Sequence, residues 1–331
     1  MAKPKVVIIS GSGRSGSTVL GLTLDSIGDV VFVGELKQIW QRGFIDNQLT
    51  GSKQPFKECP FWKPVIHEAF GSETDFNVWQ VLSAQRGIDR LRYLPSLQGW
   101  LPSPDIQAKL AIVHEAYDRL YHAIYKLTHC SVIVDSSKAI THNVYVNGID
   151  SIIPYTIHLV RDSRAVAWSW MQKKIRPEVV GSVAYMPQQS LARSAMNWNI
   201  QNFALGQLRQ DDPRYLCVRY EDFTANPIET VSKITRLYGD PTANINFLRL
   251  PSFRTEGNHT LSGNPMRFQE TVTIKPDDRW VTDMPPQQKR WVTSLTFPLL
   301  FEYGYLGGEH GKEDHDRLDS SPTQSRMTYR R

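Results

Sequence analysis

The chain has 331 residues, of which 40% are hydrophobic and 21% are charged, a balance typical of a globular protein rather than a disordered one. Its length fits one large α/β domain or two small ones. The formal net charge is +5, but no run of basic residues concentrates it, so the sequence gives no sign of a nucleic-acid partner. A basic enzyme with an anionic substrate explains this charge equally well.

Three cysteines, Cys59, Cys130 and Cys217, are scattered along the chain. They do not form the pattern of a disulfide framework, and they suit a reducing compartment. The apolar run Val6–Ile9 is too short for the core of a signal peptide, and no stretch approaches the roughly 20 apolar residues of a membrane helix. We therefore expect a cytoplasmic protein with no membrane span.

Short runs rich in β-branched residues predict strands over Val6–Ser10, Val30–Val33, Val132–Asp135, Tyr155–Val160 and Tyr215–Arg219. Continuous apolar runs of this kind suit a parallel sheet covered on both faces. Helical patterns separate several of them: Ser17–Ser26, Arg164–Lys174, and a helix that begins at Asn226 and Pro227 and ends at Gly239. Alternating strands and helices predict an α/β fold, a P-loop-like doubly wound parallel sheet with flanking helices.

Between Trp40 and Cys130 the strand pattern fades. Residues Asp105–Leu127 have apolar side chains at helical spacing and predict a long amphipathic helix. We interpret residues 40–130 as a helical insertion, made either of ordinary packing helices or of a lid or wall for an acceptor. Its aromatic residues fit an acceptor wall or the core; they include Trp40, Phe61, Trp62, Trp79 and Trp100. Residues 1–306 are expected to form one domain, and residues 307–331 a disordered polar tail.

A loop rich in glycine and serine follows the first predicted strand and precedes a helix. It consists of Gly11, Ser12, Gly13, Arg14, Ser15, Gly16, Ser17 and Thr18. Glycines let the backbone curl so that successive N–H groups point at one anion, and the helix N-terminus adds a partial positive charge. We expect a phosphate group to bind at this loop.

Three interpretations of the loop stay open at this point. Its glycines satisfy the dinucleotide pattern G-x-G-x-x-G, and Glu35 follows the second strand where a ribose-binding acid would lie, so an oxidoreductase that uses NAD or FAD is a rival. Ser17 replaces the lysine of nucleotide triphosphatases, and no acidic magnesium site is evident, which disfavours that class. The third interpretation is a nucleotide bound without a metal, with Arg14 taking over from the lysine.

A second anion site is predicted after the fourth strand. Arg161 lies at the carboxyl end of that strand, where open α/β sheets bind ligands. Along the next helix Ala165, Ser169 and Lys173 recur at positions i, i+4 and i+8 and are expected to share one face. A guanidinium, a hydroxyl and an ammonium around one point suit a phosphate dianion. The two sites together imply a nucleotide with phosphates at both ends of its ribose.

With both sites in view, the sequence resembles the sulfotransferases that use 3′-phosphoadenosine-5′-phosphosulfate (PAPS), and especially their bacterial, carbohydrate-type and tyrosylprotein-type branch. Arg14–Thr18 resembles the 5′-phosphosulfate loop of this family. Val160–Arg164, with Ser169, resembles its 3′-phosphate motif. Weaker patches follow in the family's order; they are Val33–Glu35, Glu58–Trp62, Asp135–Lys138, Arg219–Asp222 and Gly263–Arg267.

The resemblance implies that a sulfuryl group passes from PAPS to a hydroxyl acceptor by in-line displacement, without a metal. By the same resemblance Glu35 would be the general base, and Lys138 would reach the bridging oxygen of PAPS. Tyr220 would contact the nucleotide, unless it packs in the core. His142 is the alternative base.

The chain also departs from the small-molecule cytosolic branch of that family. Those proteins carry a lysine in the loop, where this chain has Arg14, and a late Arg-Lys-Gly motif that is absent here. Arg267 and Lys275 are therefore the two candidates for the late phosphate contact.

The sequence does not identify the acceptor, and a carbohydrate, a phenol, a lipid alcohol and a peptide tyrosine all fit. It also leaves the oligomeric state open. The dinucleotide oxidoreductase and a non-catalytic nucleotide-binding protein are the two alternatives. Arg161 with Ser169 argues against the first, and Glu35 with Lys138 argues against the second.

Overall fold

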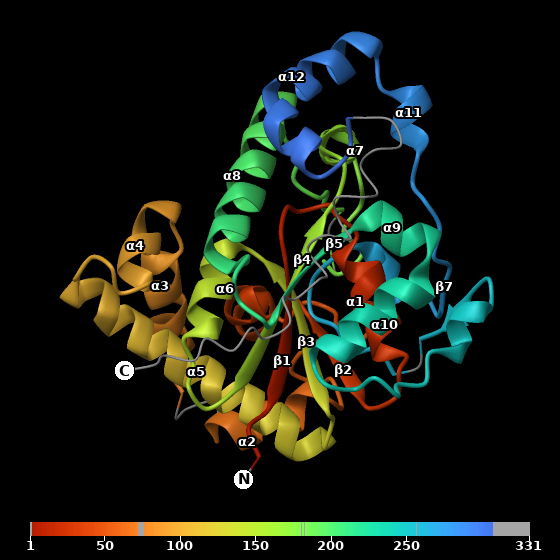
Figure 1. The fold of residues 1–331 in the computed structure, drawn as a ribbon. Helices are drawn as coiled ribbons and strands as arrows, with labels where there is room; N and C mark the ends of the chain where they lie inside the picture. The colour runs from red at the N-terminus through yellow and green to blue at the C-terminus, as the bar shows by residue number, and fades with distance from the viewer. Residues whose placement is uncertain (1, 72–75, 180, 182, 256, 307–331) are drawn as a thin grey trace, which may run out of the picture.

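Five parallel strands form the central sheet of the protein, in the order β2-β3-β1-β4-β5 (Figure 1). The computed structural model describes residues 2–71, 76–179, 181, 183–255 and 257–306, so the predicted tail, 307–331, lies outside the described residues. The strands are β1 (Lys5–Ser10), β2 (Val30–Gly34), β3 (Val132–Lys138), β4 (Ile153–Val160) and β5 (Tyr215–Arg219). All five predicted strands are confirmed, and so is their parallel arrangement.

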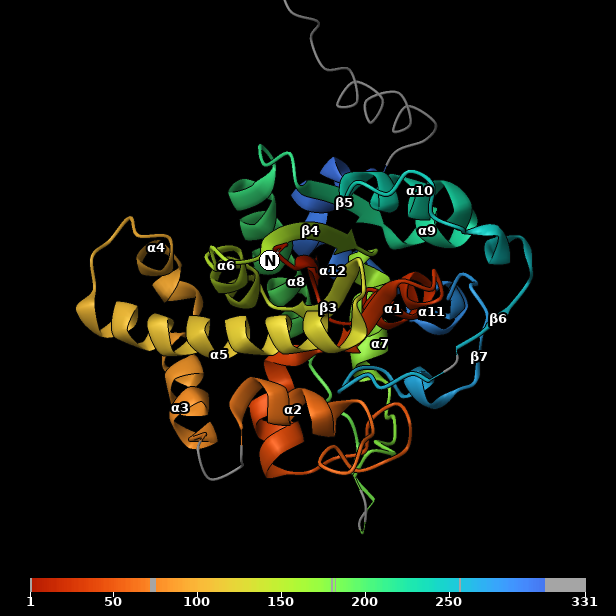
Figure 2. The ribbon, with the colours of Figure 1, turned by 90° about the horizontal axis from the view of Figure 1, so that it is seen from below.

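Helices cover both faces of this sheet because the side chains of each strand alternate between two cores. In β1, Val7 and Ile9 belong to a core shared with α1 (Ser17–Asp25), α9 (Tyr220–Ala225) and α10 (Pro227–Leu237). Val6 and Ile8 belong to the opposite core, shared with α2 (Trp62–Phe70), α5 (Pro104–Thr128) and α6 (Ile140–Asn147). Figure 2 shows α5 running along one side of the sheet. The doubly wound α/β fold predicted from the sequence is confirmed.

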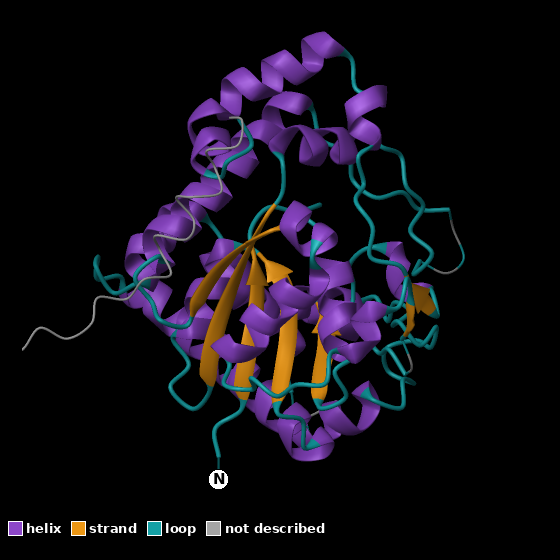
Figure 3. Cartoon of the chain, turned by 45° about the vertical axis from the view of Figure 1, so that its right-hand side comes forward, coloured by secondary structure: helices purple, strands orange, loops and turns teal. Residues whose placement is uncertain are grey.

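A further group of helices begins beyond the carboxyl end of β4, and its longest member, α8 (Leu191–Arg209), runs back along the sheet to α6 (Figures 1 and 3). The group consists of α7 (Ser163–Met171), α8, α11 (Arg279–Asp283) and α12 (Pro286–Glu302). The remaining elements are α3 (Val78–Ile88), α4 (Leu94–Leu97), η1 (Leu36–Gln38), η2 (Ile39–Ile45), η3 (Leu91–Tyr93), η4 (Asn246–Arg249), η5 (Pro265–Phe268) and a small two-stranded sheet of β6 (Phe253–Arg254) and β7 (Thr271–Val272). In the part of the chain that the structure describes, no helix combines the length and apolarity needed to span a membrane.

The segment between β2 and β3 is helical, as the sequence predicts, and it packs onto the sheet. Trp40, Trp62 and Tyr117 are fully buried in its core. Trp79 and Trp100 are instead 61% and 66% exposed, and neither lines the cavity described below. Among the described residues, only the beginning of this segment therefore contributes to the cavity.

The helix boundaries follow local signals with one exception. The Asn226 side chain accepts a hydrogen bond from the Glu229 N–H at 3.3 Å, and Gly239 ends the helix with a φ of +88°, as predicted. The prediction that a helix continues to Lys174 is wrong, since α7 ends at Met171. The chain then folds back, and the Met186 N–H donates to the Lys174 carbonyl at 2.8 Å.

Candidate active site

The glycine loop joins the carboxyl end of β1 to the N-terminus of α1. Gly16 precedes the helix with a φ of +90°, a left-handed conformation that glycine adopts without strain. A Cβ at Gly13 would lie 2.8 Å from the Trp170 ring, so the close approach of that ring requires glycine. No side chain of the described residues caps α1, which leaves its first N–H groups for a ligand.

A cavity of about 1170 Å³ lies against this loop. Its described lining carries an excess of positive charge: the cations are Arg14, Arg42, Lys138, Arg161, Lys173, Lys174, Lys275 and Arg279, and the carboxylates are Glu35 and Asp277. Such an excess attracts anionic ligands and raises their local concentration.

Glu35 and Lys138 form an ion pair in this cavity. Glu35 follows β2, Lys138 is the last residue of β3, and the Lys138 Nζ lies 2.5 Å from the Glu35 Oε1. The same ammonium donates to the Ser17 Oγ at 3.3 Å, which places it at the mouth of the glycine loop. The second carboxylate oxygen, Oε2, accepts a hydrogen bond from the Ser262 hydroxyl at 3.2 Å. Both residues that the resemblance assigns to catalysis thus meet beside the loop.

The charges around Glu35 keep its carboxylate ionised. Burial raises the pKa of Glu35. The attraction and hydrogen bond of Lys138, followed by the attraction of Arg42, lower the pKa by more than burial raises it, so the net pKa is below its ordinary value. Arg42 comes from η2 and donates to the Ser262 hydroxyl at 2.5 Å. The carboxylate is therefore in its proton-accepting form at neutral pH.

Asp135 holds the backbone on both sides of this pair. This fully buried carboxylate accepts hydrogen bonds from the Leu36 N–H at 3.3 Å and the Ser137 N–H at 2.9 Å. His142 lies 2.6 Å from its other oxygen. Burial raises the pKa of Asp135, but His142 together with the hydrogen bonds of Ser137 and Tyr121 lowers it by more, so the net pKa is below its ordinary value. His142 is fully buried as well, and it does not line the cavity in the part that the structure describes.

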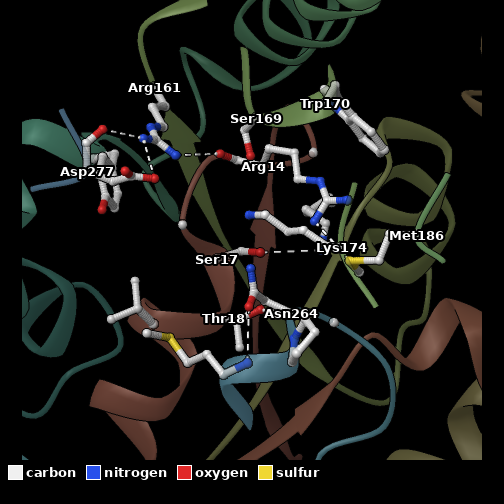
Figure 4. Close-up of a pocket in the computed structure, with 18 of the residues that line it drawn as sticks. Arg14, Ser17, Thr18, Arg161, Ser169, Trp170, Lys174, Met186, Asn264 and Asp277 are labelled. Atoms are coloured by element: carbon white, nitrogen blue, oxygen red, sulfur yellow. Dashed lines mark hydrogen bonds and ion pairs between the residues drawn. The ribbon is translucent and has the colours of Figure 1, made fainter. Parts of the chain in front are cut away.

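Arg161 follows β4 on the opposite side of the cavity (Figure 4). Its Nη1 donates to the Arg14 carbonyl at 3.2 Å, and its Nη2 donates to the Asp277 carbonyl at 2.9 Å. The guanidinium also lies 4.5 Å from the centre of the Tyr220 ring. Ser169, on α7, lines the same cavity. The structure thus brings together three of the residues predicted for nucleotide binding.

Arg14 has a different environment from the one expected for a substitute loop lysine. Its guanidinium lies 4.6 Å from the centre of the Trp170 ring, and its Nη1 lies 3.2 Å from the Met186 Sδ. Burial lowers the pKa of Arg14, and Glu35 partly offsets this effect. Arg14 therefore lines the cavity from its Trp170 side (Figure 4).

Several predicted residues lie elsewhere. Because α7 ends at Met171, Lys173 does not share a helix face with Ser169; it is exposed and lies 4.1 Å from the Tyr185 ring centre, although it still borders the cavity. Arg267 is buried and donates to the carbonyls of Thr260 and Leu49, whereas Lys275 lines the cavity. Of the two residues predicted for the late contact, Lys275 therefore faces the cavity and Arg267 does not.

Within the loop, the residues differ in what they present to the cavity. Gly13, Gly16, Ser17 and Thr18 line it, whereas Ser12 and Ser15 are buried behind the lining. The Ser15 hydroxyl donates to the Ser12 carbonyl at 2.8 Å and so fixes the bend of the loop.

Sequence reasoning missed four charged residues of the cavity, namely Arg42, Lys174, Asp277 and Arg279. None of them belongs to a motif, and they come from segments that are distant in the chain. The only available signal was position: Lys174 lies beside the predicted Lys173, and Asp277 lies two residues after the predicted Lys275.

A parallel sheet with a glycine loop at the carboxyl end of β1 and a cationic cavity beside it defines an α/β protein of the P-loop-like class. Within that class, the model of the sulfotransferase family matches residues 4–243, and the chain belongs to this family. It is a sulfotransferase enzyme, and this membership decides against the dinucleotide oxidoreductase and the non-catalytic binder.

Solved structures similar to the chain are distant in sequence. The sulfotransferase domain of the Synechococcus PCC 7002 olefin synthase is 19% identical, with a TM-score of 0.49 over 90% of this chain and 96% of that one. The sulfotransferase domain of the curacin biosynthetic pathway is 17% identical, with a TM-score of 0.48 over 89% and 98%. A mouse sulfotransferase in complex with PAP is 11% identical, with a TM-score of 0.44 over 91% and 86%. No curated protein sequence matches the chain.

Proposed function

We propose that the enzyme transfers the sulfuryl group of PAPS to a hydroxyl acceptor by in-line displacement, with Glu35 as the general base. The observation that carries this proposal is the Glu35–Lys138 ion pair beside the glycine loop, in which the Lys138 Nζ lies 2.5 Å from the Glu35 Oε1. The pair supplies both groups that the reaction needs, a base for the acceptor and a cation for the leaving group. The acceptor belongs to the broad class of carbohydrate, phenol, lipid or peptide hydroxyls.

The bonding changes assign one role to each member of the pair. The acceptor oxygen forms a bond to sulfur, the bond between sulfur and the bridging oxygen breaks, and the acceptor proton passes to Glu35. Negative charge grows on the bridging oxygen, where the Lys138 ammonium, held near Ser17, stabilises it. When Lys138 turns toward PAPS, Glu35 loses its closest cation and becomes a stronger base.

At the other end of the nucleotide, Arg161, Ser169 and Lys275 would hold the 3′-phosphate, and Tyr220 would stand against the nucleotide. In the free protein Arg161 lies 3.4 Å from the Asp277 carboxylate. A phosphate dianion would replace that carboxylate as its partner. We place the reaction in the cytoplasm because the three cysteines are free thiols.

Thermal-shift titration with the product 3′,5′-bisphosphoadenosine (PAP) tests this proposal. At a hundred times its dissociation constant, a ligand stabilises a protein by about 2.7 kcal/mol, which corresponds to a rise in Tm of about 5 °C for a chain of this size. We expect this rise with PAP and a much smaller one with 5′-AMP at the same concentration, because 5′-AMP leaves the Arg161 site empty. NAD is the comparison ligand. Equal shifts with PAP and 5′-AMP, or a larger shift with NAD, would contradict the proposal.

A further inference from the structure

Lys174 is a cation of the cavity that no sequence motif marks. It follows the end of α7 and lines the cavity together with Gly13, Arg14 and Ser17. Figure 4 shows Lys174 on the side of the cavity that carries Arg14 and Met186, across from Arg161 and Asp277. Lys174 therefore comes from the same side of the cavity as Arg14.

Lys174 and Arg14 are like charges that repel each other in the cavity. Burial lowers the pKa of Lys174, the repulsion of Arg14 lowers it further, and the attraction of Asp277 offsets part of this shift. Among the residues that the structure describes, neither side chain has a carboxylate within ion-pair distance. Two partly buried cations that repel each other destabilise the free protein, and an anion bound near both would relieve this repulsion.

The glycine loop carries one cation, Arg14, which stands where the small-molecule sulfotransferases have their loop lysine. Ser17 stands where the loop of nucleotide triphosphatases has lysine, and the Arg14 guanidinium is stacked on Trp170 and lies beside the Met186 sulfur. The backbone that carries Lys174 is fixed: its carbonyl accepts from the Met186 N–H at 2.8 Å, and Ile175 pairs with Tyr185 in an antiparallel bridge. These contacts hold the backbone of Lys174 at the border of the cavity.

We propose that Lys174 supplies a cation for the 5′-phosphosulfate end of the nucleotide, in addition to Arg14 of the glycine loop. This assignment rests on the proposed function, since it takes PAPS as the ligand of the cavity. It divides the cations of the site between the two ends of the nucleotide, with Lys174 at the 5′ end and Arg161 at the 3′ end. Lys138 stays at the bridging oxygen between sulfur and phosphorus.

Substitution of Lys174→Met tests the assignment, because methionine keeps an unbranched stem and removes the charge. Isothermal titration with adenosine 5′-phosphosulfate and with 3′-AMP reports on the two ends separately. Loss of a charge-assisted hydrogen bond should weaken adenosine 5′-phosphosulfate by about tenfold to a hundredfold. Binding of 3′-AMP should change by less than about threefold, whereas Arg161→Ala should show the opposite pattern. The Tm of the free Lys174→Met protein should equal or exceed that of the wild type.

Two further lysine variants control for loss of charge alone. Lys233→Met removes an exposed ammonium on α10 that pairs with Glu229 and is not part of the cavity lining, and this variant should bind both nucleotides like the wild type. Lys173→Met should weaken adenosine 5′-phosphosulfate less than Lys174→Met does, because the Lys173 ammonium lies over the Tyr185 ring. Equal losses in the Lys173 and Lys174 variants would indicate a general field effect and overturn the assignment.

The outcomes also separate this inference from the proposed function. If wild-type protein fails to bind PAP, the proposed function fails. If the wild type binds PAP but Lys174→Met binds adenosine 5′-phosphosulfate as tightly as the wild type, only the role of Lys174 is refuted. Equal weakening of 5′- and 3′-nucleotides by Lys174→Met would refute the placement at the 5′ end.

Discussion

Replacement of Glu35 by glutamine separates catalysis from binding and from folding. The substitution keeps the size of the side chain and its ability to accept a hydrogen bond from Lys138, which lies 2.5 Å away in the wild type. It removes the negative charge and the ability to take up a proton at neutral pH. If Glu35 is the general base, the chemical step should lose that base while the rest of the cavity stays intact.

The structure sets the expected magnitudes. Loss of a general base lowers turnover by about 10² to 10⁴, which corresponds to about 3–5 kcal/mol of activation free energy. Replacing a charged hydrogen bond by a neutral one costs about 1 kcal/mol of folding stability. The affinity for PAP should change by less than about threefold, because Arg161 and the loop do not depend on the Glu35 charge. The effect on turnover therefore exceeds any effect on the fold.

The assay requires an acceptor, which a screen of mixed hydroxyl compounds with labelled PAPS would first provide. Turnover and PAP affinity are then measured for Glu35→Gln and for Arg161→Ala. Arg161→Ala should weaken PAP strongly and leave the base in place, so turnover at saturating PAPS should change little. Wild-type turnover in Glu35→Gln would refute the general-base role. A loss of nucleotide affinity equal to the loss of turnover would instead indicate that Glu35 holds the nucleotide.

Three further predictions concern metal, pH and stability. Because Ser17 replaces the loop lysine of metal-dependent triphosphatases, transfer from labelled PAPS should survive EDTA; loss of activity that magnesium restores would contradict a metal-free reaction. Lys138 lowers the pKa of Glu35, so the Glu35 carboxylate stays ionised to a lower pH than an ordinary carboxyl group does. In Lys138→Ala the pKa of Glu35 should rise, and the acid limb of the kcat/KM profile should move to higher pH. An acid limb that does not move would show that another group titrates. Asp135→Asn removes the charge of a buried carboxylate that accepts a hydrogen bond from the Tyr121 hydroxyl at 2.9 Å and lies 2.6 Å from His142. The free energy of unfolding, measured by urea denaturation, should therefore fall by about 3–5 kcal/mol. A change below about 1 kcal/mol would show that this network contributes little to stability.

The same lowered pKa of Glu35 gives the sign of its contribution to stability. A carboxyl group whose folded pKa lies below its unfolded pKa stabilises the fold at pH values above the unfolded pKa. This contribution disappears as the pH falls through the folded pKa. Asp135, whose pKa is also lowered, acts in the same direction.

The sequence by itself determined the sheet and the position of the glycine loop. The runs Val6–Ser10 and Tyr215–Arg219 are apolar on both faces, and such runs form strands only where helices cover both sides, so the local pattern and the tertiary environment agree. The same holds for α10, whose cap residues Asn226 and Gly239 act through hydrogen bonds and φ angles within a few residues. Chemistry of this local kind is visible in one segment of sequence.

The tertiary structure alone decided which charges face the cavity. Arg267 lies in a patch that resembles the family, yet its side chain is buried against two carbonyls, whereas Lys275 reaches the cavity from an exposed segment. Lys173 and Lys174 are adjacent and chemically identical, and only the end of α7 at Met171 and the fold-back of the chain give them different surroundings. The direction of a side chain depends on packing between segments that are distant in sequence, and the spacing of residues along the chain does not contain that information.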